Sequence, residues 1–322
     1  MSSEPAKCDF LEVWIKRKEF VNQEVLNEFA RLKRGMEGEK VVLNYIKKYG
    51  RKHWRVLPNL WLDYYGTFES DLLLLTRSGS YAIEIKNYNG FFQYDNGISK
   101  LNNREIGGNA IYQTRKAAKN LRDLIGMKFY KPNVQGVLVF VGEDNPIDIS
   151  PTIDDIHILQ RNQLRGFIQK ICEEEDHGRY QQTAIDKIVT HLKAYEVDNP
   201  YQATPISPKE MAELKKGILC ANCAQSTVEV SKKFVTCLCG HVELRDEAMV
   251  RTICEYGVLN YDKELVLKDL LDFFNGQTSR NYLKTVLKRY FSMVERNRYT
   301  YYINLKLPYS KLSHLFTFTQ PN

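Results

Sequence analysis

Residues 69–86 read ESDLLLLTRSGSYAIEIK, two apolar runs separated by a short polar segment. Ser78-Gly79 is a tight-turn dipeptide, so the pattern predicts a β-hairpin. With these two residues as the loop, Asp71 lies opposite Lys86. Side chains alternate along a strand, so Glu84 and Lys86 project from one face, and Asp71 projects from that face too. The hairpin therefore predicts two carboxylates and one ammonium that converge on a sheet.

This convergence has a chemical interpretation. Carboxylate oxygens are the ligands that Mg²⁺ takes, while it keeps waters in its remaining positions. A lysine beside such a metal can position or deprotonate a water and offset the charge of a phosphate. The alternative is a structural ion pair between Glu84 and Lys86 at a sheet edge. Asp71, at its spacing from this pair, favours the metal site, because an unpaired buried charge is costly.

The elements around the hairpin predict a mixed α/β domain, with antiparallel strands followed by a helix, a strand and further helices. The apolar spacing predicts a helix over Phe10–Tyr49, with a break near Gly35. The other predicted strands are Arg55–Leu62, Gly90–Tyr94 and Val134–Val141, and the other predicted helices are Gly108–Leu124, Gln160–Glu175 and Tyr180–Tyr195.

The run Gly35-Met36-Glu37-Gly38-Glu39 is similar to the Gly-x-x-Gly-Glu signature of the NERD (nuclease-related) domain. The later motifs of that family follow in order, namely Asp71, Glu84-Ile85-Lys86, Asn87-Tyr88-Asn89-Gly90 and Gln113. The resemblance covers about residues 34–141. It implies the restriction-endonuclease-like core of the PD-(D/E)XK nucleases, a mixed sheet flanked by helices.

The resemblance also implies roles for single residues. Asp71 and Glu84 would bind Mg²⁺ or Mn²⁺, and Lys86 would serve the attacking water. Glu39 would complete the acidic shell. Gln113 resembles a glutamine that RecB-like nucleases place near the metal or the DNA backbone.

Two positions leave alternatives open. Glu37 and Glu39 lie about 200° apart on a helix, so only one can face the site. Glu39 alone matches the motif, although it could instead be a carboxylate favoured by a helix N-terminus. The family often has a proline near the start of the glutamine helix, where this chain has Gly108-Asn109-Ala110. Gln113 could therefore be an ordinary surface residue.

Four of the seven cysteines lie within twenty residues, in two close pairs. Four thiolates in such pairs can wrap one Zn²⁺ tetrahedrally, so the pattern predicts a structural zinc ribbon. The second pair is one residue shorter than the usual spacing, and His241 could replace Cys239 as the fourth ligand. The predicted ligands are Cys220, Cys223, Cys237 and Cys239.

The C-terminal region resembles a winged helix. Leu265–Phe274 and Ser279–Phe291 are predicted helices joined by a short break, and Arg296–Ile303 is the predicted wing. Residues 248–322 carry 11 Lys and Arg against 6 Asp and Glu, an excess of five positive charges. The predicted nucleic-acid contacts on the second helix are Arg280, Lys284, Lys288 and Arg289. The alternative is a helical pair that packs on the nuclease core.

The chain has 322 residues, a formal net charge of +7 and 43% hydrophobic residues, which is typical of a soluble protein with more than one domain. We expect a nuclease domain over 1–199, a Pro- and Ser-containing linker over 200–216, the ribbon over 217–247 and the winged-helix-like domain over 248–322. No apolar stretch is long enough to span a bilayer, and the first residues lack a signal-peptide pattern, so the sequence predicts a cytoplasmic protein.

The leading functional hypothesis is a metal-dependent nuclease acting on DNA, with the ribbon and the tail holding the nucleic acid. A second hypothesis is a non-catalytic DNA-binding or regulatory protein with an inactive core. A third is an adaptor that docks a protein partner. The sequence has no helicase or ATP-binding motif, so any motor would be a separate chain.

Overall fold

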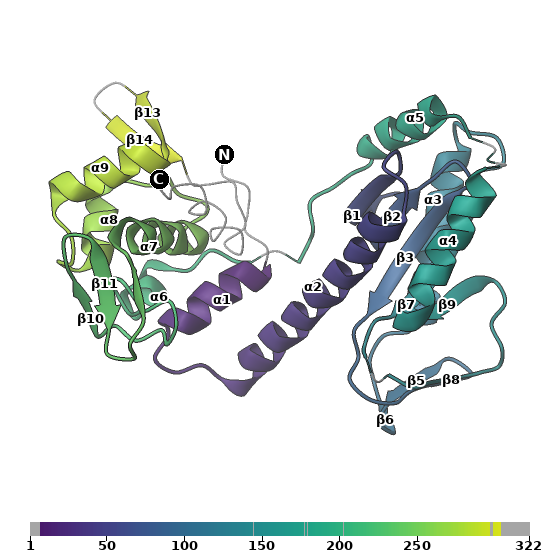
Figure 1. The fold of residues 1–322 in the computed structure, drawn as a ribbon, viewed down its shortest axis with the longest axis horizontal. Helices are drawn as coiled ribbons and strands as arrows, with labels where there is room; N and C mark the ends of the chain where they lie inside the picture. The colour runs from purple at the N-terminus through teal and green to yellow at the C-terminus, as the bar shows by residue number, and fades with distance from the viewer. Residues whose placement is uncertain are drawn as a thin grey trace. The chain divides into compact units, whose positions relative to one another are not determined.

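The computed structural model describes residues 7–143, 145–176, 178, 180–201, 203–296 and 299–303. The chain forms two compact units (Figure 1). The central unit is Arg31–Asn199, and the terminal unit joins Met1–Ala30 with Pro200–Asn322. The first 30 residues thus group with the C-terminal part of the chain, whereas the sequence suggested that they belong to the nuclease domain.

A five-stranded mixed sheet forms the middle of the central unit, in the order β1-β2-β3-β7-β9. The first three strands are antiparallel, and β3, β7 and β9 run parallel. The parallel strand β7 is almost entirely apolar, as expected for a strand covered on both faces. The strand bounds are β1 Arg55–Asp63, β2 Thr67–Leu75, β3 Ser80–Lys86, β7 Val134–Phe140 and β9 Ile156–Gln160.

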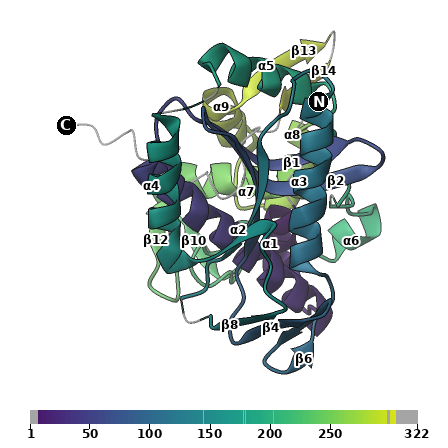
Figure 2. The same ribbon diagram turned by 90° about the vertical axis from the view of Figure 1, so that its right-hand side faces the viewer.

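Helices cover both faces of this sheet, which confirms the mixed α/β prediction. Leu72 and Leu74 pack with α2 (Gln23–Tyr49) and α4 (Leu164–Glu175). The alternate residues Leu73 and Leu75 point the other way, toward α3 and α5. The helix α3 spans Ala110–Gly126, and α5 spans Gln182–Lys193. Figure 2 shows α3 and α4 on opposite sides of the sheet.

The β2–β3 hairpin has a different register from the one predicted. Leu75 pairs with Ser80, so continuing the ladder places Asp71 opposite Glu84. The prediction that Asp71 lies opposite Lys86 is therefore wrong by two residues. Because side chains repeat every two residues along a strand, a shift of two leaves each residue on its original face.

The register differs because the loop has four residues, Thr76–Gly79, instead of two. The Thr76 backbone amide donates to the Gly79 carbonyl at 2.9 Å, and the Thr76 hydroxyl accepts from the Gly79 amide at 3.2 Å. The Asn133 side chain donates to the Ser78 carbonyl at 3.0 Å and holds the loop from outside. Side-chain hydrogen bonds thus fix a longer turn than the dipeptide indicated.

The N-terminal helical region also differs from the prediction. The break falls after α1 (Lys7–Arg17), and α2 continues through Gly35 without interruption. Gly38 has a packing role, since a Cβ there would lie 3.0 Å from Cβ of Asn87 and 3.1 Å from Cγ2 of Val141. The glycine lets α2 approach the ends of β3 and β7 closely.

A smaller four-stranded sheet, which the sequence did not predict as a unit, lies in the order β6-β5-β4-β8. Phe92 and Tyr94 of β4 pack with Ile111 of α3 and with Phe140, so the two sheets share a core. The bounds are β4 Phe92–Asp95, β5 Ile98–Leu101, β6 Arg104–Glu105 and β8 Ile147–Ser150; a 3-10 turn, η1, spans Arg161–Gln163.

The terminal unit combines a three-stranded antiparallel sheet with helices and a β-hairpin. Its core is built mainly by α7, α8 and α9, with Val235 from the small sheet and Tyr302 from the hairpin. An isolated bridge pairs Leu265 with Tyr302 and ties the hairpin to the segment before α8. The bounds are α6 Pro208–Ala212, β10 Val228–Val230, β11 Phe234–Cys237, β12 Val242–Leu244, α7 Arg245–Leu259, α8 Leu267–Phe274, α9 Arg280–Tyr290, β13 Ser292–Arg296 and β14 Tyr299–Ile303.

The order of α7, bridge, α8, α9 and hairpin agrees with the winged-helix-like outline. Ser279 caps α9, and its hydroxyl accepts from the Tyr282 amide at 3.3 Å. Residues 297–298 of the predicted wing and 304–322 of the predicted domain lie outside the described residues. Among the residues described, no helix has the length and apolar character that crossing a membrane requires.

The helix α1 packs against α7 through a buried ion pair. Arg17 and Glu255 are both fully buried, and the Arg17 Nε–H donates to Glu255 Oε2 at 2.9 Å. The same guanidinium donates to the carbonyls of Lys215 and Gly217, at 2.8 and 3.1 Å. These contacts explain why the N-terminal residues belong to the terminal unit.

Candidate functional site

Asp71, Glu84 and Lys86 meet on one face of the β2–β3 hairpin, as the sequence predicted. The Lys86 ammonium donates to Glu84 Oε1 at 2.7 Å. The Asp71 carboxylate accepts from the Ile85 backbone amide at 2.7 Å, which fixes its orientation beside Glu84. The three groups are therefore held by the sheet itself.

Negative charge exceeds positive charge in this group. Burial, and then the neighbouring Glu84, raise the pKa of Asp71 well above its ordinary value. Burial opposes the charged form of Lys86, but Glu84 and Tyr88 outweigh it and raise the pKa of Lys86. One ammonium thus faces two carboxylates, an arrangement that a further cation would stabilise.

Glu69 is a third carboxylate of this site, and the sequence analysis did not assign it. Glu69 precedes Asp71 by two residues on β2. Its side chain keeps contact with solvent, yet the surrounding protein, followed by Glu84 and Glu39, raises the pKa of Glu69 to about 7. The signal that could have found it is this two-residue spacing from Asp71.

Glu39 approaches Glu69 from α2. It is half-buried, whereas Glu37 is exposed, so the structure favours the glutamate that matches the motif. Burial raises the pKa of Glu39, against the effect of a hydrogen bond from Asn59, whose amide donates to Glu39 Oε2 at 3.2 Å. Glu39 also contributes to the raised pKa of Glu69, which places the two charges near each other.

Asn59 is a second residue that sequence reasoning missed. It has a positive φ of 50° in the middle of β1, where Pro58 pairs with Leu72 and Leu60 pairs with Ser70. The left-handed backbone is one that asparagine tolerates better than most residues. No motif in the sequence distinguishes this asparagine from others in strands or turns.

The turn that follows β3 is tied to the motif on α2. The Asn87 side chain donates to the Arg34 carbonyl at 2.8 Å, next to Gly35. Gly90 adopts a φ of 120°, and a Cβ there would overlap the Asn102 side chain, so only glycine fits. The Gly-x-x-Gly-Glu and Asn-x-x-Gly segments thus meet at the carboxyl end of β3.

Gln113 lies in the first turn of α3 and is exposed. Its helix begins over the carboxyl end of β7, where Ala110 and Ile111 pack with Leu138 and Phe140. In the part of the chain that the structure describes, the Gln113 side chain has no hydrogen bond to these carboxylates. Its role in the site stays a prediction.

The carboxylates suit a hard divalent cation. Mg²⁺ typically takes one or two protein carboxylates and completes its coordination with water and substrate phosphates. Asp71 and Glu84 supply such a pair. Within the described residues, no three of these carboxylates lie close enough together to hold one metal ion, whereas a cluster of four cysteines does.

Comparison with protein families identifies the region that holds this site. Residues 34–141 match the family model of the nuclease-related domain, NERD. The chain carries a nuclease-related domain. The match includes all five residues predicted for the acidic site and ends just after β7. Neither a search of curated proteins nor a search of solved structures found a match to the chain.

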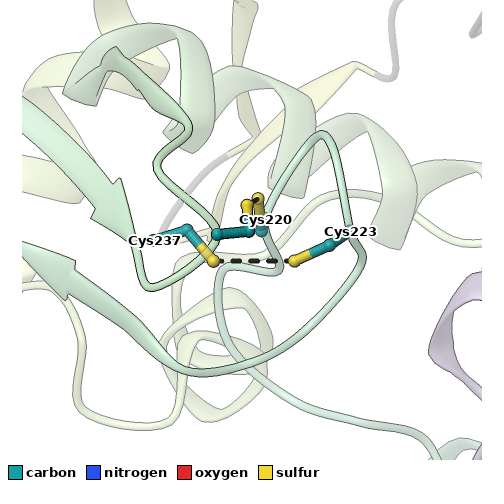
Figure 3. Close-up of side chains that lie close together, drawn as sticks. Cys220, Cys223 and Cys237 are labelled. Carbon is teal, nitrogen blue, oxygen red and sulfur yellow. Dashed lines mark hydrogen bonds between the residues drawn. The ribbon is translucent and has the colours of Figure 1, made fainter.

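A second candidate metal site lies outside the nuclease-related domain, in the three-stranded sheet of the terminal unit. The sulfurs of Cys220 and Cys239 are 3.6 Å apart. Those of Cys223 and Cys237 are also 3.6 Å apart (Figure 3). All four sulfurs lie within 4.8 Å of one another. Sulfurs about 2.3 Å from a tetrahedral zinc would lie roughly 3.8 Å apart, so the geometry fits one ion.

This arrangement favours four cysteines over a set that includes His241. The four thiols gather without the His241 ring. A backbone hydrogen bond from His241 instead lowers the pKa of Cys239 to about 6, which favours the thiolate form. The cluster and its sheet are compatible with a zinc ribbon.

The residues predicted for nucleic-acid contact lie on the exposed side of α9. Arg280, Lys284 and Lys288 are exposed at intervals of four residues, so they follow one side of the helix. Arg289 is exposed as well, but it pairs with Asp246 at 2.9 Å. The opposite side of α9 is buried in the core of the terminal unit.

Proposed function

We propose that this protein is a metal-dependent nuclease that hydrolyses phosphodiester bonds in DNA. The observation that carries the proposal is the pair of carboxylates Asp71 and Glu84 beside Lys86, in the region that matches the nuclease-related domain. Glu69 lies close to this group, and Glu39 lies close to Glu69. A site with this excess of negative charge is unfavourable in the absence of a cation, so a structural role alone explains it poorly.

In this proposal Asp71 and Glu84 hold Mg²⁺ or Mn²⁺, with Glu39 and Glu69 nearby as further acidic groups. The metal would polarise the phosphoryl oxygen and lower the pKa of a bound water. The Lys86 ammonium, held by Glu84, positions the attacking water and offsets the charge of the phosphate. Gln113, at the start of α3, would contact the metal or the DNA backbone.

The terminal unit would bind the nucleic acid. The four cysteines hold one structural zinc, which orders the ribbon, and the basic side of α9 follows the phosphate backbone. A separate motor protein would supply any strand separation that the reaction needs.

The test is cleavage of linear and circular DNA in Mg²⁺, in Mn²⁺ and in EDTA. Asp71→Ala and Glu84→Ala should lower the rate about 100-fold or more, because a catalytic metal stabilises the transition state by several kcal/mol. Lys86→Ala should lower the rate by about 100-fold with a smaller change in metal affinity. Glu39→Ala should also reduce cleavage.

Glu37→Ala is the matched control for Glu39→Ala, because it removes an exposed carboxylate from the same helix. It should leave cleavage unchanged. Cleavage that persists in EDTA or in the Glu84→Ala protein would contradict the proposal. A well-folded protein that binds DNA and never cleaves it would support a non-catalytic DNA-binding function instead.

A further inference from the structure

We propose that α9 lies in the major groove of duplex DNA and that Asn281 selects adenine there. This inference rests on the proposed function, since it names the form of DNA that the protein binds and a residue that determines sequence preference.

The geometry of α9 places Asn281 at the middle of its exposed side. Leu283, Val286 and Leu287 are buried, and they define the side that packs on the core. At about 100° per residue, the direction opposite their mean falls within about 30° of Asn281 and Thr285. Both side chains are exposed. These two residues therefore project farthest from the unit.

Asn281 is also suited to contact a base edge, both by its position in the helix and by its chemistry. It is the second residue of α9, and the N-terminal residues of a recognition helix are those that contact base edges. In the described residues no hydrogen bond engages its side-chain amide, while its backbone carbonyl accepts from the Thr285 hydroxyl at 3.0 Å. A free asparagine amide can pair with N6 and N7 of adenine in the major groove.

The charges around Asn281 are suited to contact with DNA phosphates. The helix α9 contains no acidic residue. Lys284 and Lys288 lie about 70° and 35° to one side of the outward direction, with Arg280 farther round on that side. Arg289 lies about 65° to the other side, where it pairs with Asp246. The major groove is about 12 Å wide and admits one helix with phosphates on both sides. A row of cations on one side of Asn281 and Thr285 can contact the phosphates along one wall of the groove, beside the neutral groups that face the bases.

The aromatic residues of α9 argue against single-stranded nucleic acid. Binding of single strands relies on exposed aromatic rings that stack on the bases. Tyr282 and Tyr290 are instead half-buried, and both hydroxyls donate to the Asp246 carboxylate. Arg245 covers the Tyr282 ring, 3.8 Å from its centre. Neither ring is available as a stacking platform, so the duplex is the better substrate.

The test uses the full chain with Glu84→Ala, so that bound DNA is not cut. A library of random duplexes is bound, and the bound fraction is sequenced. This protein should enrich a motif with adenine at a fixed position, preferred about 10-fold or more over other bases. Adding Asn281→Ala should reduce that preference to below about 2-fold while affinity for the whole library changes little. Asn281→Gln should restore part of it, since glutamine can make the same pair.

A second pair of variants separates sequence preference from binding itself. Lys284→Ala with Lys288→Ala should weaken binding to all duplexes and flatten the salt dependence by about two units of log–log slope. Lys187→Ala with Lys193→Ala removes two exposed charges from α5 and should do neither. No enrichment, enrichment that survives Asn281→Ala, or tighter binding to single strands would overturn the inference. Asn281-dependent enrichment by a wild-type protein that never cleaves DNA would uphold it and reject the nuclease.

Discussion

At the scale of single residues, the acidic site has the features of a binding site that is not optimised for stability. Asp71 lies next to the Leu72–Ile83 pair and close to Glu84, where like charges repel. Lys86 neutralises one of them, and Glu69 adds a further carboxylate nearby. Sites of this kind commonly cost stability that function requires.

Neutral replacements should therefore stabilise the metal-free protein. Asp71→Asn keeps an oxygen that can accept from the Ile85 amide and removes the repulsion with Glu84. In EDTA at pH 8 we expect its Tm to rise by about 2–4 °C, as for a gain near 1 kcal/mol in a domain of this size. Calorimetry of the full chain measures this.

Glu143→Gln is the control, because Glu143 is an exposed residue paired with Arg161 and should change Tm little. Added Mg²⁺ or Mn²⁺ should raise the Tm of the wild-type protein and have less effect on Asp71→Asn. A lower Tm for Asp71→Asn in EDTA would mean that Asp71 has a structural role.

At the scale of elements, α1 is held to α7 and α8 by interactions that its own sequence does not predict. Arg17 donates to Glu255 on α7 and stacks over the Phe273 ring of α8, 4.4 Å from its centre. Glu255 also accepts from Lys16 and Arg251. A buried carboxylate with several cationic partners stays charged, but loss of one partner leaves charge without compensation.

Removing Arg17 should destabilise the terminal unit strongly. We expect Arg17→Ala to lower its free energy of unfolding by about 3–5 kcal/mol, the usual cost of breaking a buried pair. Hydrogen exchange should then accelerate in α7 and α8, while β3 and α3 of the central unit stay protected.

Lys18→Ala provides the comparison, because Lys18 pairs with Glu213 at an exposed position and should contribute less than about 1 kcal/mol. Replacing both partners, as Arg17→Met with Glu255→Leu, should recover much of the lost stability. Equal effects of Arg17→Ala and Lys18→Ala would contradict this account of α1.

At the scale of the whole molecule, the candidate acidic site and the cysteine cluster lie in different units. The nuclease-related domain lies in the central unit, and the four cysteines lie in the terminal unit. The cysteine sheet shares a core with the helices beside it, since Val235 of β11 and Ile218 pack with α7 and α8. A change at the cysteines should therefore reach α7, while the central unit has its own core.

Loss of zinc should unfold the ribbon and loosen α7 without affecting the central unit. Elemental analysis should find about one zinc per chain, and Cys220→Ser should lose it. Hydrogen exchange in that variant should increase over residues 217–259 and stay unchanged in β3 and β7.

Cys172→Ser is the control, because Cys172 lies in the central unit, away from the cluster, and its variant should keep zinc. Zinc retained in Cys239→Ser but lost in His241→Ala would make His241 the fourth ligand. Protein that contains no zinc and shows unchanged hydrogen exchange would contradict the zinc-ribbon prediction.

The sequence predicted most of the elements correctly, because the apolar patterns in them are strong. The strands β1, β2, β3 and β7 and the helices α3, α4, α5, α8 and α9 lie within a few residues of their predicted bounds. The exceptions follow from contacts that are not local. The break at Gly35 was wrong because Gly38 and its helix pack on the ends of β3 and β7, which outweighs the low helix propensity of glycine.

The sequence by itself determined which hairpin residues share a face, because side chains alternate with a period of two whatever the register. It could also indicate the cysteine cluster, whose spacing lies within twenty residues. Only the tertiary structure decided that Asp71 faces Glu84, since the Thr76 and Asn133 side chains set the loop. It alone brought Glu39 near Glu69, and Arg17 to Glu255 across 238 residues. Such contacts depend on how packed elements approach one another, which no local pattern encodes.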